Sequence, residues 1–139
     1  VMEYINGNEY TVDAAFGNSG ELISYNQRIR KKQLGGATIY TYNDYSIDVK
    51  NQLMQISNQY LCKGIVNFQF ILCNNEAYFT DVNLRYASGG LPLSVKSGMD
   101  VVDILLGIMN GDNLKEKDYP MDRRRVVMYR HFDETYSVL

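Results

Sequence analysis

The chain has 139 residues, of which 45% are hydrophobic and 22% are charged, with a formal net charge of −2 and a pI near 5.3. This hydrophobic content suffices for a core, so the composition excludes a disordered chain and indicates one ordinary domain or a large piece of one. The acidic balance argues against a general nucleic-acid-binding surface. No apolar run is long enough for a transmembrane helix. We therefore expect neither nucleic acid nor a membrane as a partner.

The first part of the chain predicts strands joined by tight turns. Its segments are a short strand or hinge at 1–6, a strand at 9–16, a glycine-containing turn at 17–20 and a return strand at 21–30. The Gly35–Gly36 pair that follows indicates a flexible loop. A helix is predicted over 46–61 with Ser46 as its N-cap, because apolar residues recur there every three or four positions.

The second part predicts another hairpin and then helices. Its segments are a hairpin at 64–83, a short helix at 92–97, a helix at 100–109, a charged linker at 112–123 and a final strand at 124–132. The resulting order is β-β-α-β-β-α-α-β. Strands joined by hairpins predict an α+β fold, in which an antiparallel sheet has its helices packed on one face.

Few residues could support nucleophilic or zinc chemistry. Cys62 and Cys73 are the only cysteines, without CxxC spacing, and His131 is the only histidine. We interpret the cysteines as reduced thiols of a cytoplasmic protein, with a single disulfide as the less favoured alternative. A lone histidine makes triad and zinc chemistry close to excluded. The chain begins at Val1 inside a strand-like pattern, without a signal peptide, and we expect a fragment of a longer protein.

A basic cluster ends the return strand of the first hairpin. It consists of Arg28, Arg30, Lys31 and Lys32. Runs of charge are most often solvated loops. The alternative is an electrostatic funnel for a phosphate or an acidic substrate. The sequence leaves both interpretations open.

The hairpin at 64–83 is the most informative segment. Alternation along a strand places Asn67 and Gln69 on one face of its first strand, and Asp81 and Asn83 on one face of its second. If the two faces coincide, their oxygen atoms converge into a set of ligands that suits Mg²⁺. Arg85 follows closely and could hold a phosphoryl or carboxylate group bidentately. The alternative is a solvent-facing polar edge with an ordinary cross-strand hydrogen bond.

The register of this hairpin decides between the two interpretations. A two-residue turn at 74–75, which the local sequence favours, would put Gln69 and Asp81 on opposite faces of the sheet. A shared metal site needs Gln69 opposite Asp81 and Asn67 opposite Asn83. That arrangement requires a connection with an odd number of residues, or a β-bulge. We predict the register that the metal site needs.

Three motifs in order resemble the ATP-grasp enzymes, and in particular their carbamoyl-phosphate-synthetase-like branch. Glu3–Asp13 resembles the family's hinge, Gly64–Gln69 with Asp81–Arg85 its metal-binding hairpin, and Gly89–Pro92 the following loop. The resemblance implies that the chain is the second half of an ATP-grasp fold.

Within that fold, residues 1–111 would form the C-terminal subdomain, and residues 112–139 the linker and final strand of the same domain. The family's ATP site lies between two subdomains, of which this chain resembles only the second.

The resemblance also implies a role for individual residues toward ATP. Glu3 and Ile5, with the intervening backbone, would lie along the adenine, and Glu9 would accept hydrogen bonds from the ribose. The Gly89–Gly90 pair is either a simple turn or a set of backbone amides facing an oxyanion.

Toward the metal, the resemblance implies that Gln69, Asp81 and Asn83 hold Mg²⁺ against the phosphates. Arg85 would be the catalytic residue that contacts the transferred phosphoryl group. The family usually has glutamate at the position of Asp81 and proline at that of Leu84. The shorter carboxylate implies a monodentate or water-mediated metal contact.

The function implied is that of a fragment of an ATP- and Mg²⁺-dependent carboxylate–amine or carboxylate–thiol ligase. Such an enzyme forms an acyl-phosphate, and in the carbamoyl-phosphate-synthetase-like variant the acid would be bicarbonate or carbamate. We expect the fragment to be inactive alone, because half of the phosphate-holding site is missing. The expected partners are ATP and a small carboxylate; a homodimer stays open. The alternative is a non-catalytic nucleotide-binding or assembly module with the same fold.

Overall fold

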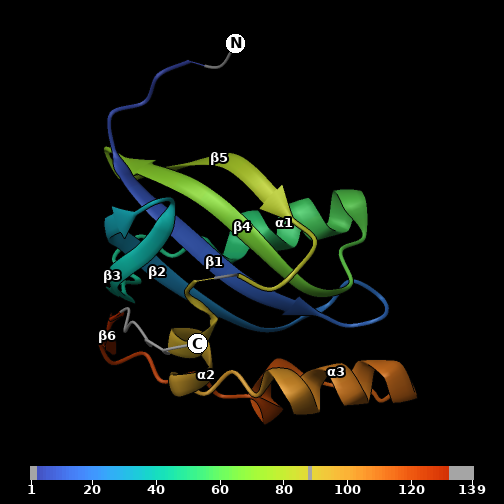
Figure 1. Ribbon diagram of the computed structural model, residues 1–139. Coiled ribbons are helices and arrows are strands. Elements are labelled where there is room, and N and C mark those ends of the chain that lie inside the picture. Colours follow the sequence, from blue (N-terminus) through green and yellow to red (C-terminus); the bar gives the residue numbers. More distant parts are fainter. Residues whose placement is uncertain (1–2, 88, 132–139) are drawn as a thin grey trace, which may run out of the picture.

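The computed structural model describes residues 3–87 and 89–131 and centres on a six-stranded antiparallel sheet (Figure 1). The order of the strands is β5-β4-β1-β2-β3-β6. The strands are β1 (Asn8–Phe16), β2 (Leu22–Leu34), β3 (Ala37–Asn43), β4 (Gly64–Cys73), β5 (Glu76–Asn83) and β6 (Val127–Tyr129). The helices are α1 (Lys50–Tyr60), α2 (Leu91–Lys96) and α3 (Val101–Asn110), with a 3₁₀ turn, η1 (Glu116–Asp118).

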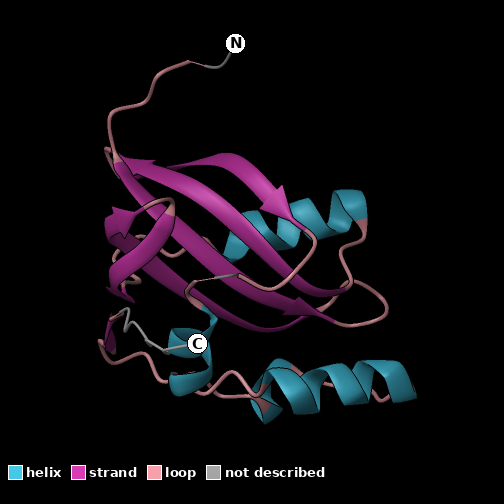
Figure 2. Cartoon of the chain, in the orientation of Figure 1, coloured by secondary structure: helices cyan, strands magenta, loops and turns pink. Residues whose placement is uncertain are grey.

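The α+β class is confirmed, but the expectation that all helices pack on one face is wrong. Figure 2 shows helices on either side of the sheet. Val12 of β1 packs in a cluster with Leu53 of α1, whereas Ala15 of β1 packs with Ile104 of α3. Residues 12 and 15 point to opposite faces because side chains alternate along a strand. Amphipathic periodicity shows that each helix has a buried side but does not say which face of the sheet covers it.

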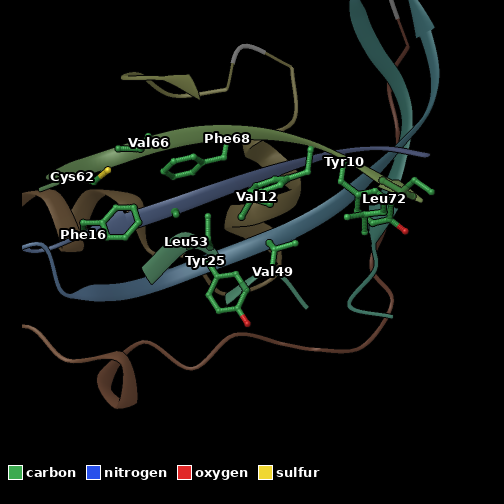
Figure 3. Close-up of a cluster of buried hydrophobic side chains, with 13 residues drawn as sticks. Tyr10, Val12, Phe16, Tyr25, Val49, Leu53, Cys62, Val66, Phe68 and Leu72 are labelled. Atoms are coloured by element: carbon green, nitrogen blue, oxygen red, sulfur yellow. The ribbon is translucent and has the colours of Figure 1, made fainter. Parts of the chain in front are cut away.

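The main core lies between α1 and one face of β1, β2 and β4 (Figure 3). Phe16 and Phe68 meet edge to face with ring centroids 6.1 Å apart, and both side chains are fully buried. Burying aromatic and aliphatic side chains of this size is the dominant favourable contribution to folding. The opposite face carries a second apolar cluster that includes Ile104 of α3 and Ile23, and buried polar side chains such as Asp13 lie on the same face.

The third strand, β3, was not predicted. Gly35 and Gly36 were expected to open a flexible loop, but they form a tight turn between β2 and β3, with φ of 55° and 80°. Two consecutive positive φ angles are those of a two-residue hairpin turn, and glycine adopts them without strain. The register of β2 against β3 shifts twice between Arg30 and Gln33. These irregularities obscure the alternation that a regular hairpin would show in the sequence.

Helix α1 begins at Lys50, and the prediction that Ser46 is its N-cap is wrong. The segment before the helix is instead held to the sheet by Gln27 of β2. The Gln27 amide donates to the Ile47 carbonyl at 2.7 Å and accepts from the Val49 N–H at 3.2 Å. A long-range side chain therefore sets the start of this helix, and local capping patterns do not contain that information.

The later elements lie close to their predicted places. Helices α2 and α3 begin and end within a residue of the predicted bounds, and the Asp100 side chain accepts from the Asp103 N–H at the start of α3. The final strand is shorter than the predicted 124–132, whose last residue lies outside the described ranges, as does Val1. Strand β6 pairs with β3, so the end of the described chain belongs to the same sheet.

Both cysteines are free thiols, Cys62 buried and Cys73 half-buried, as the interpretation without a disulfide expects. Within the described ranges no helix combines the length and the apolar character that a membrane crossing requires.

Leu61, which ends α1, adopts the left-handed backbone conformation with φ of 50°. Replacing Leu61 by glycine is expected to raise the free energy of unfolding by about 1 kcal/mol, because glycine adopts this conformation without the usual cost. Leu61 is 55% exposed, so little apolar burial is lost. The same change one residue earlier, Tyr60→Gly, lies inside the helix and should lower stability by about 1 kcal/mol. Urea unfolding measures both, and two changes of the same sign would contradict the prediction.

Candidate functional site

The hairpin of β4 and β5 has the register that the predicted metal site needs. Gln69 lies opposite Asp81, and Asn67 lies opposite Asn83. The turn at 74–75 is nevertheless the tight two-residue turn that the local sequence favours, with positive φ at both asparagines. The register shifts between Gln69 and Phe70, because a bulge leaves one extra residue in β5. The prediction of this register is confirmed, and the bulge reconciles it with the turn.

Asp81 and Asn83 are directly coupled on their shared face of β5. The Asn83 side-chain amide donates to Asp81 Oδ2 at 2.9 Å. Asp81 is exposed, whereas Asn83 and the facing Gln69 are half-buried. The exposed carboxylate is free to meet a cation from solvent, and the hydrogen bond fixes the orientation of the amide, whose oxygen then points away from Asp81.

A polar pocket of about 170 Å³ adjoins this hairpin. It opens on the polar face of the sheet and is closed at one side by the loop before α2. Three of its lining side chains are arginines, and the others are small or polar. The lining residues are Thr11, Arg28, Arg30, Gly36, Ala37, Thr38, Asn67, Gln69, Asn83, Arg85, Ala87, Gly89 and Gly90. A pocket with this lining attracts a small anion.

The structure divides the basic cluster at the end of β2. Arg28 and Arg30 line the pocket, whereas Lys31 and Lys32 are exposed and fit the alternative of solvated charge. Burial lowers the pKa of the Arg28 guanidinium, and the neighbouring Asp13 opposes that effect. An arginine remains charged under such conditions, so the pocket keeps a cation at its wall.

Glu9 at the start of β1 lies beside the same pocket, in a cluster that includes a residue the sequence did not single out. Gln33 donates to Glu9 Oε2 at 3.0 Å, and Arg30 Nη1 lies 3.3 Å from the same oxygen. Arg30 in turn donates to Gln33 Oε1 at 2.6 Å. Glu9 is therefore fixed in position by two residues of the neighbouring strand. Gln33 gave no sequence signal, because it follows two exposed lysines in an irregular part of β2.

The structure does not bring Glu3 and Ile5 to this cluster. Both precede β1 in a segment that runs away from the sheet, and neither lines the pocket (Figure 1). Arg85, by contrast, lines the pocket, and its Nη1 donates to the Tyr86 carbonyl at 3.0 Å. The structure thus brings Arg85 to the same pocket as Gln69 and Asn83, and leaves Glu3 and Ile5 apart from it.

Beneath the pocket lies a buried network that sequence reasoning missed. Asp13 of β1 is fully buried and accepts hydrogen bonds from Asn67 at 2.8 Å and from the Ser94 hydroxyl at 2.6 Å. Asn26 donates to Ser94 at 3.1 Å. Polar residues in the middle of strands are depleted in general, and that was the one available signal. The network ties α2 to the sheet and fixes Asn67 at the side of the pocket.

The ligand set suits a hard cation. Asp81 offers one carboxylate and the facing Gln69 an amide oxygen, and Asn83 would offer its amide oxygen once its side chain turns and gives up the hydrogen bond to Asp81. Mg²⁺ is commonly held by few protein ligands of this kind, with water and phosphate as the others. Within the described residues no three histidine, cysteine, aspartate or glutamate side chains gather into a metal-binding group. The arrangement favours a cation shared with a phosphate over one enclosed by protein ligands.

Together these features bring three arginines and several oxygen-bearing side chains to one pocket on an antiparallel sheet. A family model described as "ATP-grasp in the biosynthetic pathway with Ter operon" matches residues 1–135. The chain therefore belongs to the ATP-grasp family.

Curated relatives include the carbamoyl phosphate synthase large chains of Clostridium beijerinckii and Clostridium acetobutylicum. The first is 30% identical over 131 residues, which are 88% of this chain and 12% of the relative. The second is 28% identical over 134 residues, 90% of this chain and again 12% of the relative. The resemblance to the carbamoyl-phosphate-synthetase-like branch is thus confirmed, and the chain spans about an eighth of these relatives' length.

Solved structures with the same fold include biotin carboxylases. The complex of the Campylobacter jejuni enzyme described as biotin carboxylase-beta-gamma-ATP has a TM-score of 0.69 at 18% identity, over 86% of this chain and 29% of that one. The biotin carboxylase domain of Hydrogenobacter thermophilus 2-oxoglutarate carboxylase, with MgADP, ADP and bicarbonate, has a TM-score of 0.65 at 15% identity, over 85% and 28% of the two chains. At these identities the likeness establishes the fold.

Proposed function

We propose that the chain is the C-terminal part of an ATP- and Mg²⁺-dependent carboxylate–amine or carboxylate–thiol ligase. The observation that carries the proposal is the register of the β4–β5 hairpin. It places Gln69 opposite Asp81 and Asn67 opposite Asn83, next to a pocket lined by arginines. The turn at 74–75 is regular, so the register of these ligands depends on the bulge in β5. Bulges of this kind commonly redirect side chains at functional sites.

In this proposal Gln69, Asp81 and Asn83 hold Mg²⁺, which neutralises phosphate charge when it is bound. Glu9, held by Gln33 and Arg30, accepts hydrogen bonds from the ribose. For Glu3 and Ile5 we propose contacts to the adenine once the preceding part of the protein is in place. The chain spans only 12% of a carbamoyl phosphate synthase large chain and 29% of a biotin carboxylase chain, which is consistent with an ATP site completed outside this chain.

The chain's own residues position and neutralise groups and form no covalent intermediate. The γ-phosphoryl group of ATP is transferred to the substrate carboxylate, giving ADP and an acyl-phosphate. The amine or thiol then attacks the acyl carbon, and phosphate leaves. Arg85 contacts the transferred phosphoryl group, where a guanidinium stabilises the charge on its oxygens. Catalysis of this kind depends on positioning and electrostatics.

The test of the proposal is ATP consumption by the full-length protein with a panel of small acids, each with an amine or thiol acceptor. Release of ADP and phosphate that needs both the acid and Mg²⁺ supports the ligase. Tight MgATP binding without turnover in any combination would favour the alternative, a non-catalytic nucleotide-binding or assembly module in the cytoplasm. A homodimer is compatible with either function.

The purified 139-residue chain is expected to catalyse no ATP-dependent ligation. The chain provides the metal-binding hairpin and Arg85, but the proposal places the remaining phosphate contacts in the preceding part of the protein. Losing the positioning of ATP removes most of the rate enhancement in this type of reaction. A coupled assay of ADP release, with the full-length protein as the positive control, measures this. Acid-dependent ADP release by the short chain at a rate near that of the full protein would refute the prediction.

A further inference from the structure

Arg28 is a buried cation whose surroundings leave part of its hydrogen-bonding capacity unused. Its side chain is 3% exposed, and Nε lies 3.5 Å from Asp13 Oδ2, at the limit of a useful contact. Among the described residues, Nε has no hydrogen-bond partner. Both oxygens of Asp13 already accept shorter bonds, from Asn67 and Ser94. A buried charge is costly unless acceptor atoms surround it, so this guanidinium lacks an acceptor that the pocket can supply.

The loop before α2 confines this guanidinium at the wall of the pocket. A Cβ added to Gly90 would lie 2.0 Å from Arg28 Cζ, so the backbone passes directly over the charged group. This close approach leaves the pocket as the side from which a further acceptor can reach Arg28. A glycine at position 90 is therefore needed for the guanidinium to keep its place.

The three arginines of the pocket differ in their charge balance. Arg30 is paired with Glu9 at 3.3 Å. Arg85 donates to a backbone carbonyl, and within the described residues no carboxylate lies within ion-pair distance of it. Arg28 has Asp13 beside it but an unused donor. Two guanidinium groups, Arg28 and Arg85, thus remain available to anionic groups of a ligand in one small pocket.

We propose that the acid substrate carries a second anionic group besides the carboxylate that is activated, and that Arg28 binds this second group. The proposal rests on the proposed ligase function and names its substrate class: a small dicarboxylate. The partial neutralisation of Arg28 by Asp13 favours a singly charged carboxylate there over a doubly charged phosphate. The second carboxylate distinguishes this substrate from bicarbonate, which has one anionic group.

The test compares malonate with acetate as probes of the full-length protein by isothermal titration calorimetry. Malonate is expected to bind about tenfold or more tightly than acetate, since each hydrogen bond to a charged group contributes that much or more. In Arg28→Met, malonate affinity should fall about tenfold or more, and acetate affinity should change less than about twofold. Unchanged malonate affinity in this variant would overturn the proposal.

Two further variants keep the test decisive. Gly90→Ala retains the arginine but displaces its guanidinium, so it should lose the same preference for malonate; retention of that preference would overturn the proposal even if Arg28→Met failed to fold. The matched control is Arg124→Met, because Arg124 is 89% exposed and lies outside this pocket. It should bind both probes like the parent protein, and a loss of malonate binding there would mean that general surface charge is responsible.

Titration of MgADP and MgATP separates this proposal from the ligase function itself. Both nucleotides should bind Arg28→Met as they bind the parent protein. If Arg28→Met weakens MgATP but not malonate, the guanidinium serves a phosphate of the nucleotide and the dicarboxylate proposal is wrong. If the parent protein binds malonate through Arg28 but binds no MgATP, the pocket is a dicarboxylate site and the ligase function fails.

Discussion

Replacing Asp81 by asparagine in the full-length protein is expected to lower the rate of ATP-dependent turnover by about 100-fold or more, while the fold stays intact. Asp81 is the single carboxylate among the three proposed metal ligands, and a cation bearing phosphate tolerates the loss of that charge poorly. The side chain is exposed and its hydrogen bond comes from Asn83, so asparagine of the same size does not disturb the sheet. Initial rates over a range of Mg²⁺ concentrations measure the effect.

The matched control is Asp112→Asn, because Asp112 is an exposed aspartate in the loop that follows α3. It removes the same charge at a distance from the hairpin and should leave turnover and its Mg²⁺ dependence unchanged. Unchanged kinetics in Asp81→Asn would show that Asp81 is not a ligand of the metal. An equal loss in both variants would show that net charge, and no specific ligand, determines the rate.

The hairpin that carries these ligands shows how local and long-range information combine. The sequence favoured a tight turn at 74–75 and, separately, a register that such a turn does not permit. Both are present, because the bulge in β5 shifts the pairing by one residue between Phe70 and Gln69. Turn preference is encoded in two adjacent asparagines and could be predicted. The position of a bulge depends on packing across the whole sheet, so no short pattern specifies it.

The polar face of the sheet was harder to predict than the apolar one. Alternating apolar residues revealed the β1–β2 and β4–β5 hairpins, though not the β2–β3 hairpin, and apolar periodicity revealed α1 and α3. Asp13 and Asn26 were not recognised as members of a buried network. Taken alone, each is only a residue type that β-strands disfavour. Only the pairing of Asp13 with Asn26 across the β1–β2 ladder, and the arrival of Ser94 from a distant helix, gives them a shared role.

The basic cluster illustrates a similar limit. Arg28, Arg30, Lys31 and Lys32 are consecutive charges in the sequence apart from one isoleucine, but two line the pocket and two face solvent. Strict alternation would have placed Arg30 and Lys32 on one face. The register shifts between β2 and β3 break that alternation just after Arg30. Lys31 and Lys32 therefore fit the solvated loop, whereas Arg28 and Arg30 lie where the funnel interpretation needs them, and that interpretation stays a prediction.

Removing the Asp13 carboxylate is expected to lower the stability of this chain strongly. Asp13→Ala should lower the free energy of unfolding by about 3–5 kcal/mol, because it leaves the Arg28 charge buried without a counter-ion. It also leaves the Asn67 amide and the Ser94 hydroxyl without their acceptor. The same change at exposed Asp112 should alter stability by less than about 0.5 kcal/mol. Urea unfolding followed by circular dichroism measures both.

A double-mutant cycle identifies the cause of that loss. Arg28→Met removes the buried cation and keeps a side chain of comparable length, so Asp13→Ala should cost about 1–3 kcal/mol less in the Arg28→Met background than in the parent chain. The remaining cost in that background reports the unsatisfied Asn67 and Ser94 donors. Additive effects of the two substitutions would show that the 3.5 Å contact between Arg28 and Asp13 contributes no coupling. In that case the carboxylate stabilises the sheet only through its two hydrogen bonds, and the charge of Arg28 is balanced from the side of the pocket.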